Sequence, residues 1–196
     1  MSKNLLIQNI NNHVNLSDDE AELLMSLMES KIIKARKLFL REGDISTHFA
    51  FVTNGCMRSY SVDNNGFEHV LAFAPSGWWI GDLYSLISKK GGILNIEAIE
   101  DTKLLLLSKE NQNLLFEKIP KFERFFRILA ENSLVAYHER TIDNLSHSAA
   151  ERYERFCYIY PQLIKSLPQK HIAAYIGVTP EFFSKMRSHF LKTQKK

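Results

Sequence analysis

The spacing of apolar residues changes twice along the chain. Residues 16–28 show helical spacing, and Ser17 followed by Glu20 forms a capping box, so this segment predicts a helix. Residues 32–107 contain short apolar or alternating runs separated by turn-forming residues. From Ser108 onward the spacing is helical again. We therefore expect a β-rich body between helical segments.

The middle segment predicts an antiparallel sandwich or barrel. The turns between its runs contain Gly, Asn, Asp and Pro, and Asn65-Gly66 is a strong hairpin signal because both residues tolerate positive φ. Short strands with frequent turns are typical of all-β architectures. The predicted strands are Lys37–Leu40, Phe49–Thr53, Met57–Val62, His69–Phe73, Leu94–Ile99 and Lys103–Leu107.

A long helix follows. Ser108 caps a short helix, and a narrow apolar stripe then continues from Lys121 to Leu145. Seven turns with so narrow a stripe need a partner, either the barrel or a second copy of the chain. We expect a homodimer with Leu129, Ser133 and Ala136 near its seam.

The C-terminal segment predicts a helix-turn-helix. Capping boxes at Ser148–Glu151 and Ser166–Gln169 open two helices. The second helix ends at Gly177, and the small Ala173 before this turn allows two short helices to cross closely. A third helix follows, with Thr179 as N-cap, Pro180 in its first turn and Phe183, Met186 and Phe190 on its buried face.

Charge supports a polyanion partner for this end. The whole chain carries a net charge of +3, but residues 163–196 hold seven basic residues against one acid, Glu181. A basic terminal segment on a mildly acidic body is typical of nucleic-acid binding, although a solubilising tail has the same composition.

We expect double-stranded DNA to contact this module. Glu181 is suited to cytosine N4, and Lys185 to guanine or a phosphate. Lys170 and Arg187 are suited to phosphate oxygens, and the third helix would present Arg187 outward. An ordinary helical hairpin remains the alternative. The candidate DNA-binding residues are Lys170, Thr179, Glu181, Ser184, Lys185 and Arg187.

The composition favours the cytoplasm. The N-terminus lacks the features of a signal peptide, and no apolar run is long enough to span a membrane. Cys56 and Cys157 lie far apart and have no CxxC partner, which favours a reducing compartment and argues against a thiolate-held metal.

The order of parts resembles the Crp/Fnr family of regulators over nearly the whole chain. The barrel marks are Gly43-Asp44, Asn54-Gly55, Asp63-x-x-Gly66-x-Glu68 and Gly81-Asp82-Leu83, and the DNA-binding mark runs from Gln169 to Glu181. The resemblance implies an α+β fold: an N-terminal double-stranded β-helix (jelly-roll) barrel with flanking helices, a long dimerisation helix and a winged-helix-like helix-turn-helix lacking a full wing. The implied divisions are a cyclic-nucleotide-binding-like sensor domain at 1–119, a dimerisation helix at 120–147 and a DNA-binding domain at 148–196.

Departures from the family argue against a cyclic nucleotide as cofactor. Family members that bind one hold the ribose with a Glu and the phosphate with an Arg followed by Ser or Thr. Here Asp82 replaces the Glu, and Leu94-Asn95 stands where the Arg pair belongs. Without a bidentate cation, burying the phosphate is unfavourable. The candidate ligand-binding residues are Gly81, Asp82, Leu83, Leu94 and Asn95, and an unidentified small-molecule effector stays open.

Other chemistry finds less support, and we expect no catalytic or metal site. The main rival is a small-molecule-binding barrel without DNA binding, such as a cupin-like enzyme or a sensor, but the barrel region offers only His48 and His69, without HxH spacing. The pair Trp78-Trp79 fits either a ligand pocket or the core. Gly91-Gly92 fits a flexible turn.

Overall fold

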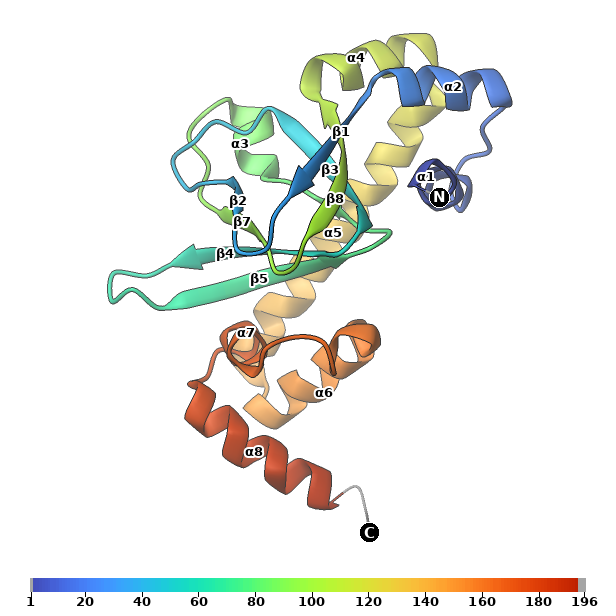
Figure 1. Cartoon of the computed structure of the whole chain (residues 1–196). Helices are drawn as coiled ribbons and strands as arrows, with labels where there is room; N and C mark the ends of the chain where they lie inside the picture. The colour runs from blue at the N-terminus through green and yellow to red at the C-terminus, as the bar shows by residue number, and fades with distance from the viewer. Residues whose placement is uncertain (1, 194–196) are drawn as a thin grey trace. The chain divides into compact units, whose positions relative to one another are not determined.

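The computed structural model describes residues 2–193, with side chains described for residues 3–189. Figure 1 shows its helices and strands. The first part contains α1 (Ser2–Asn11), α2 (Asp18–Ser26), β1 (Met28–Ile33), β2 (Leu38–Leu40), β3 (His48–Asn54), β4 (Cys56–Val62), β5 (Glu68–Pro75), β6 (Trp79–Ile80), α3 (Leu83–Ser88), β7 (Asn95–Ala98), β8 (Thr102–Ser108) and α4 (Lys109–Lys118). The second part contains α5 (Lys121–Ser146), α6 (Ala149–Ile159), the 3-10 turn η1 (Pro161–Leu163), α7 (Gln169–Ile176) and α8 (Pro180–Thr193).

The chain forms two compact units. The first comprises Met1–Ser61 and Leu71–Glu131, and the second comprises Val62–Val70 and Asn132–Lys196. The division therefore falls inside α5, and the tip of the β4–β5 hairpin belongs to the second unit. The linear three-part division inferred from the sequence stays a prediction.

Two four-stranded antiparallel sheets form the first unit, in the orders β1-β8-β3-β6 and β2-β7-β4-β5. Strand β8 is buried on both faces because Leu104 and Leu106 join the core contributed by both sheets, whereas Leu105 and Leu107 pack against a helical cluster. That cluster includes Leu6 of α1, Leu24 of α2 and Phe122 and Phe125 of α5. The predicted mixed fold with a jelly-roll barrel is confirmed.

Several local predictions are confirmed. The capping box of Ser17 and Glu20 opens α2, and that of Ser148 and Glu151 opens α6. Ser108 caps α4 by accepting a hydrogen bond from the Asn111 amide at 3.0 Å. In each case a side-chain oxygen satisfies an amide that the helix itself leaves unpaired.

Other local predictions are wrong. Met28 belongs to β1 rather than to the preceding helix. The predicted box at Ser166 and Gln169 does not form: Pro168 is the N-cap of α7, without a side-chain hydrogen bond. The Ser166 hydroxyl instead donates to carbonyls in the turn that begins at Pro161, so it is already engaged before α7 starts.

The β4–β5 hairpin forms as predicted, with a different turn. Of Asn65 and Gly66, only Gly66 adopts positive φ, at 82°. The Asp63 carboxylate accepts hydrogen bonds from the amides of Asn65 and Phe67 at 2.8 and 3.0 Å. An aspartate at the start of the loop therefore holds the turn that the Asn-Gly pair alone was expected to set.

Gly91 and Gly92 lie in a turn that packs closely against the turn at Gly43 and against Asp82, and not in the flexible turn expected from the sequence. A Cβ on Gly91 would lie 2.6 Å from the Gly43 carbonyl oxygen, and one on Gly92 would lie 2.6 Å from the Asp82 carboxylate. The Gly43 amide donates to the Gly92 carbonyl at 2.9 Å. The two glycine-containing turns therefore fit together only because side chains are absent.

Trp79 is partly buried and packs against the core of the first unit. Its ring lies 5.3 Å from that of Phe49 and 5.2 Å from that of Phe51, and its indole N–H donates to Asn9 at 3.1 Å.

Within residues 2–193, no helix combines the length and apolarity needed to cross a bilayer.

Candidate nucleic-acid interface

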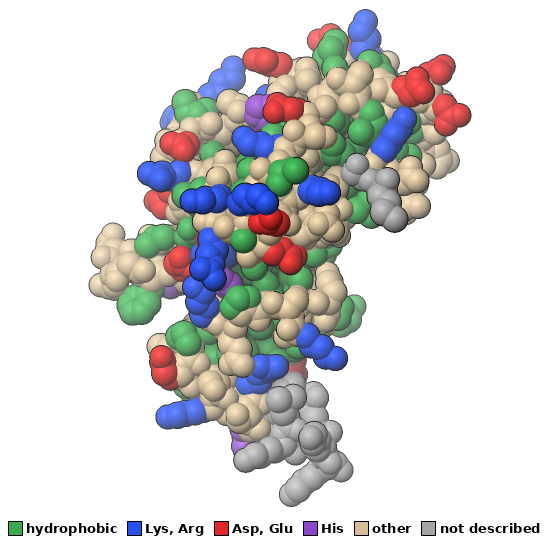
Figure 2. Space-filling view, viewed as in Figure 1, with side chains coloured by type: hydrophobic (Ala, Val, Ile, Leu, Met, Phe, Trp, Pro, Cys, Tyr) green, Lys and Arg blue, Asp and Glu red, His purple; other side chains and the backbone are tan. Residues whose placement is uncertain are grey.

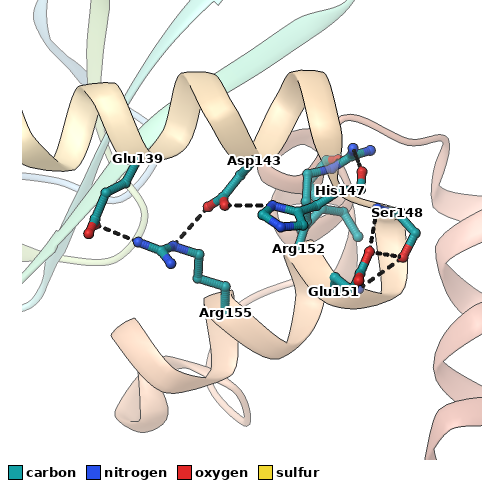
Figure 3. Close-up of polar contacts among 8 residues, drawn as sticks. Glu139, Asp143, His147, Ser148, Glu151, Arg152 and Arg155 are labelled. Atoms are coloured by element: carbon teal, nitrogen blue, oxygen red, sulfur yellow. Dashed lines mark hydrogen bonds and ion pairs between the residues drawn. The ribbon is translucent and has the colours of Figure 1, made fainter.

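A polar network joins the end of α5 to α6 within the second unit (Figure 3). Arg155 of α6 forms ion pairs with Glu139 and Asp143, which lie one turn apart on α5. His147 extends the network, with Nδ1 lying 3.0 Å from the Asp143 carboxylate. A guanidinium can hold two carboxylates with fixed geometry, so these contacts set the angle at which α6 leaves α5.

Two further arginines tie α7 to the helices before it. Arg152 of α6 donates to the carbonyls of Ile176 at 2.8 Å and His147 at 2.6 Å. Arg140 of α5 donates to the carbonyls of Tyr175 and Val70, so it joins α7 to the base of the hairpin tip. The last carbonyls of α7 thus gain cationic donors, which helix C-termini favour.

The core of the helical module is aromatic. Phe183 of α8 is fully buried, with its ring 5.2 Å from that of Tyr153 on α6. Phe156 of α6 and Tyr160, the C-cap of that helix, pack against the ring of Tyr175 at 5.5 and 5.7 Å. The predicted inward face of α7 is confirmed, because Ile172, Ala173 and Ile176 are buried.

The turn between α7 and α8 has the predicted chemistry. Gly177 ends α7 in the left-handed conformation at φ 73°, which costs little only for glycine. The amide of Val178 donates to the Ala173 carbonyl at 3.0 Å. Thr179 then caps α8 by accepting a hydrogen bond from the Phe182 amide at 3.2 Å. These contacts fix where α8 begins.

Five of the six predicted DNA-contacting residues are exposed. Thr179, Glu181, Ser184 and Lys185 lie in the cap and first turns of α8, and Lys170 lies in the first turn of α7. On the face drawn in Figure 2, acidic and basic side chains are interspersed rather than gathered by sign. Phe190 lies outside the described side chains.

Arg187 does not project outward as expected. Its side chain is half-buried, and its Nε atom is buried without a hydrogen-bond partner among the described residues. Its charge acts on Tyr153 and Cys157 of α6, where burial raises the pKa of both side chains and Arg187 partly offsets the rise. The helical period turns this position toward α6, because Arg187 follows the buried Phe183 by four residues.

Two of the predicted ligand-binding residues of the barrel, Asp82 and Asn95, already form hydrogen bonds with other residues of the barrel. Asp82 is buried and caps α3, accepting hydrogen bonds from the amides of Ser85 and Ile93 at 3.0 Å each. Asn95 is buried; its side-chain oxygen accepts a hydrogen bond from the Glu42 amide, and its side-chain nitrogen donates to the Glu42 carboxylate. Leu94 is buried, whereas Leu83 is at the surface. One carboxylate oxygen of Asp82 therefore caps α3, and the other holds Ile93 in the loop before β7.

Sequence reasoning missed a buried ion pair in the barrel. Arg58 of β4 pairs with Glu97 of β7, its neighbour in the strand register, and the guanidinium carbon lies 4.1 Å from the centre of the Tyr60 ring. Both charged side chains are largely buried. Side chains alternate between the two faces of β4, so Arg58 and Tyr60 lie on the same face. This shared face was the sequence signal from which the buried arginine could have been inferred. This cation is neutralised within the barrel itself.

Comparisons with known proteins agree with this arrangement. Residues 31–118 match the family model of the cyclic nucleotide-binding domain. The cyclic AMP receptor protein of Thermus thermophilus is 27% identical over 105 residues, 54% of this chain and 48% of that protein. The fumarate and nitrate reduction regulatory protein of Vibrio cholerae is 23% identical over 192 residues, 91% of this chain and 76% of that protein. The structure of FixK2 from Bradyrhizobium japonicum matches at a TM-score of 0.75 and 20% identity, covering 86% of each chain.

The fold and the module define a protein with a cyclic nucleotide-binding-type barrel followed by a helix-turn-helix. The matches confirm the predicted resemblance to the Crp/Fnr family: residues 31–118 fit the cyclic nucleotide-binding domain, and two regulators are similar to this chain at 27% and 23% identity. The chain aligns with under half of the length of the Thermus relative.

Proposed function

We propose that the chain is a DNA-binding transcriptional regulator of the Crp/Fnr type that acts on double-stranded DNA in the bacterial cytoplasm and catalyses no reaction. The observation that carries this proposal is the start of α8, where Thr179, Glu181, Ser184 and Lys185 are exposed next to the turn that Thr179 caps. A recognition helix contacts base edges with such N-terminal residues.

The regulator would act as a homodimer through α5. Val135 and Ile142 lie seven residues apart on this helix and are each more than half exposed, and Leu145 is 80% exposed. A seven-residue spacing of apolar side chains is the spacing of a coiled-coil seam. Leu129 packs against the helical cluster of the first unit, so we move the proposed seam from Leu129 to Val135 and Ile142.

Such a dimer would hold two copies of α8 about 34 Å apart, one turn of DNA, and would bind a two-fold symmetric site. The barrel would not take cyclic AMP, because the Arg58 guanidinium is paired with Glu97 and both carboxylate oxygens of Asp82 accept hydrogen bonds from backbone amides. An effector of another chemical class is compatible with the fold.

A binding assay tests the proposal. Purified protein is titrated against a randomised duplex library and against its own upstream DNA, and the selected duplex is measured over a salt series. We expect a symmetric site and an affinity that falls steeply with salt, because basic side chains displace counterions from phosphates. Failure to enrich any site, with no salt-dependent binding, would favour the barrel protein without DNA binding.

A further inference from the structure

Two adjacent phenylalanines in the first turns of α8 have opposite environments. Phe183 is fully buried against Tyr153, whereas Phe182 is 54% exposed. The packing of the module therefore depends on Phe183. Phe182 places an aromatic ring at the surface beside the side chains proposed to contact DNA.

The position of Phe182 is fixed by its backbone. Its amide donates to the Thr179 hydroxyl at 3.2 Å, so it sits in the capped first turn of α8. Glu181 precedes it, and Lys185 follows one turn later on the same face; both are exposed. The exposed start of α8 thus offers three different surfaces: a carboxylate, an apolar ring and an ammonium group.

We propose that Phe182 recognises thymine through the 5-methyl group in the major groove; this rests on the proposed function. The thymine methyl is the one apolar group that a base pair presents in that groove, and a phenylalanine side chain is a suitable contact for it. Glu181 and Lys185 match the amino group of cytosine and the acceptors of guanine. Phe182 therefore specifies a thymine within each half-site.

The test removes the methyl group from the DNA. The duplex selected by the wild-type protein is remade with deoxyuridine in place of each thymine in turn, and its affinity is measured for the wild type and for Phe182→Ala. We expect one thymine per half-site whose replacement weakens wild-type binding about fourfold, the factor for one buried methyl group. Phe182→Ala should bind the thymine duplex more weakly and be insensitive to that replacement.

Three controls separate the outcomes. Phe182→Ala should keep the wild-type unfolding midpoint, because the ring is exposed. Phe182→Leu should retain part of the sensitivity to the methyl group. Lys185→Ala should lose affinity and still respond to deoxyuridine.

The inference is overturned, while DNA binding stands, if replacing any single thymine by deoxyuridine leaves the affinity of the wild type unchanged. It is also overturned if the replacement weakens binding of Phe182→Ala as much as it weakens binding of the wild type. If the wild-type protein selects no duplex at all, the proposed function has failed instead.

Discussion

The guanidinium carbon of Arg140 lies 3.9 Å from the centre of the Tyr175 ring. The same side chain donates hydrogen bonds to the carbonyls of Tyr175 and Val70. One arginine therefore joins α5, the end of α7 and the hairpin tip within the second unit. Arg140 therefore fixes the end of α7 relative to α5.

Replacing Arg140 by Met should destabilise the second unit by about 1.5–3 kcal/mol, the range for hydrogen bonds from a charged donor. The reason is that two carbonyls lose their cationic partner. Urea unfolding gives the free energy, and hydrogen exchange of residues 62–70 should speed up. Arg127→Met is the matched control, because Arg127 forms an exposed pair with Glu131. Equal stability of the two variants would contradict the proposed role of Arg140.

Phe183→Ala should cost about 3–5 kcal/mol, because it empties a fully buried aromatic site against Tyr153. We expect lost near-ultraviolet circular dichroism and lost DNA binding at every sequence. Phe182→Ala, one residue away, should leave the unfolding free energy nearly unchanged. If both variants unfold at the same denaturant concentration as the wild type, the assignment of the core is wrong.

Much of this module could be predicted because its signals are local. Gly177, Thr179 and the Ser148–Glu151 box each act within a few residues, and each has its expected role. The Arg187 environment and the Arg140 contacts depend on packing between separate helices, which residue spacing does not encode.

In the barrel, too, local features could be predicted from the sequence, whereas contacts between distant segments could not. Alternating runs predicted most strands, but β1 and the two-residue β6 lack an apolar alternation and are defined by their partners β8 and β3. The family pattern pointed to Asp82 as a ligand residue. Its hydrogen bond to the Ile93 amide in the α3–β7 loop comes from tertiary folding, as does the Arg58–Glu97 pair.

Asp82→Ala should destabilise the barrel by about 0.5–2 kcal/mol from the lost cap of α3 alone, with a further cost because the Ile93 amide loses its acceptor. Thermal unfolding of wild-type protein should not shift when cyclic AMP is added. A cyclic AMP-dependent rise in the midpoint that disappears in Asp82→Ala would show that this carboxylate does bind a nucleotide.

The capping box of α6 predicts a pH dependence. Hydrogen bonds from the side chain and amide of Ser148 hold the pKa of Glu151 below its ordinary value of 4.5. A lowered folded-state pKa adds stability that is present above pH 4.5 and is lost as the pH falls through the folded pKa. The stability advantage of wild type over Glu151→Gln should therefore shrink in acid. Urea unfolding between pH 3 and 7 measures it, with Glu154→Gln as control; a constant difference would exclude the linkage.

The exposed heptad of α5 predicts the quaternary structure. Val135→Glu combined with Ile142→Glu should convert the dimer to a monomer, because a charged seam cannot be desolvated in a coiled coil. Sedimentation equilibrium measures the mass, and DNA affinity should fall because one half-site alone remains bound. Tyr158→Glu is the control, since Tyr158 is an exposed aromatic residue on α6 rather than on α5. Leu129→Glu should instead lower the stability of the first unit, where Leu129 packs. An intact dimer in the double variant, with Leu129→Glu monomeric and fully folded, would return the seam to Leu129.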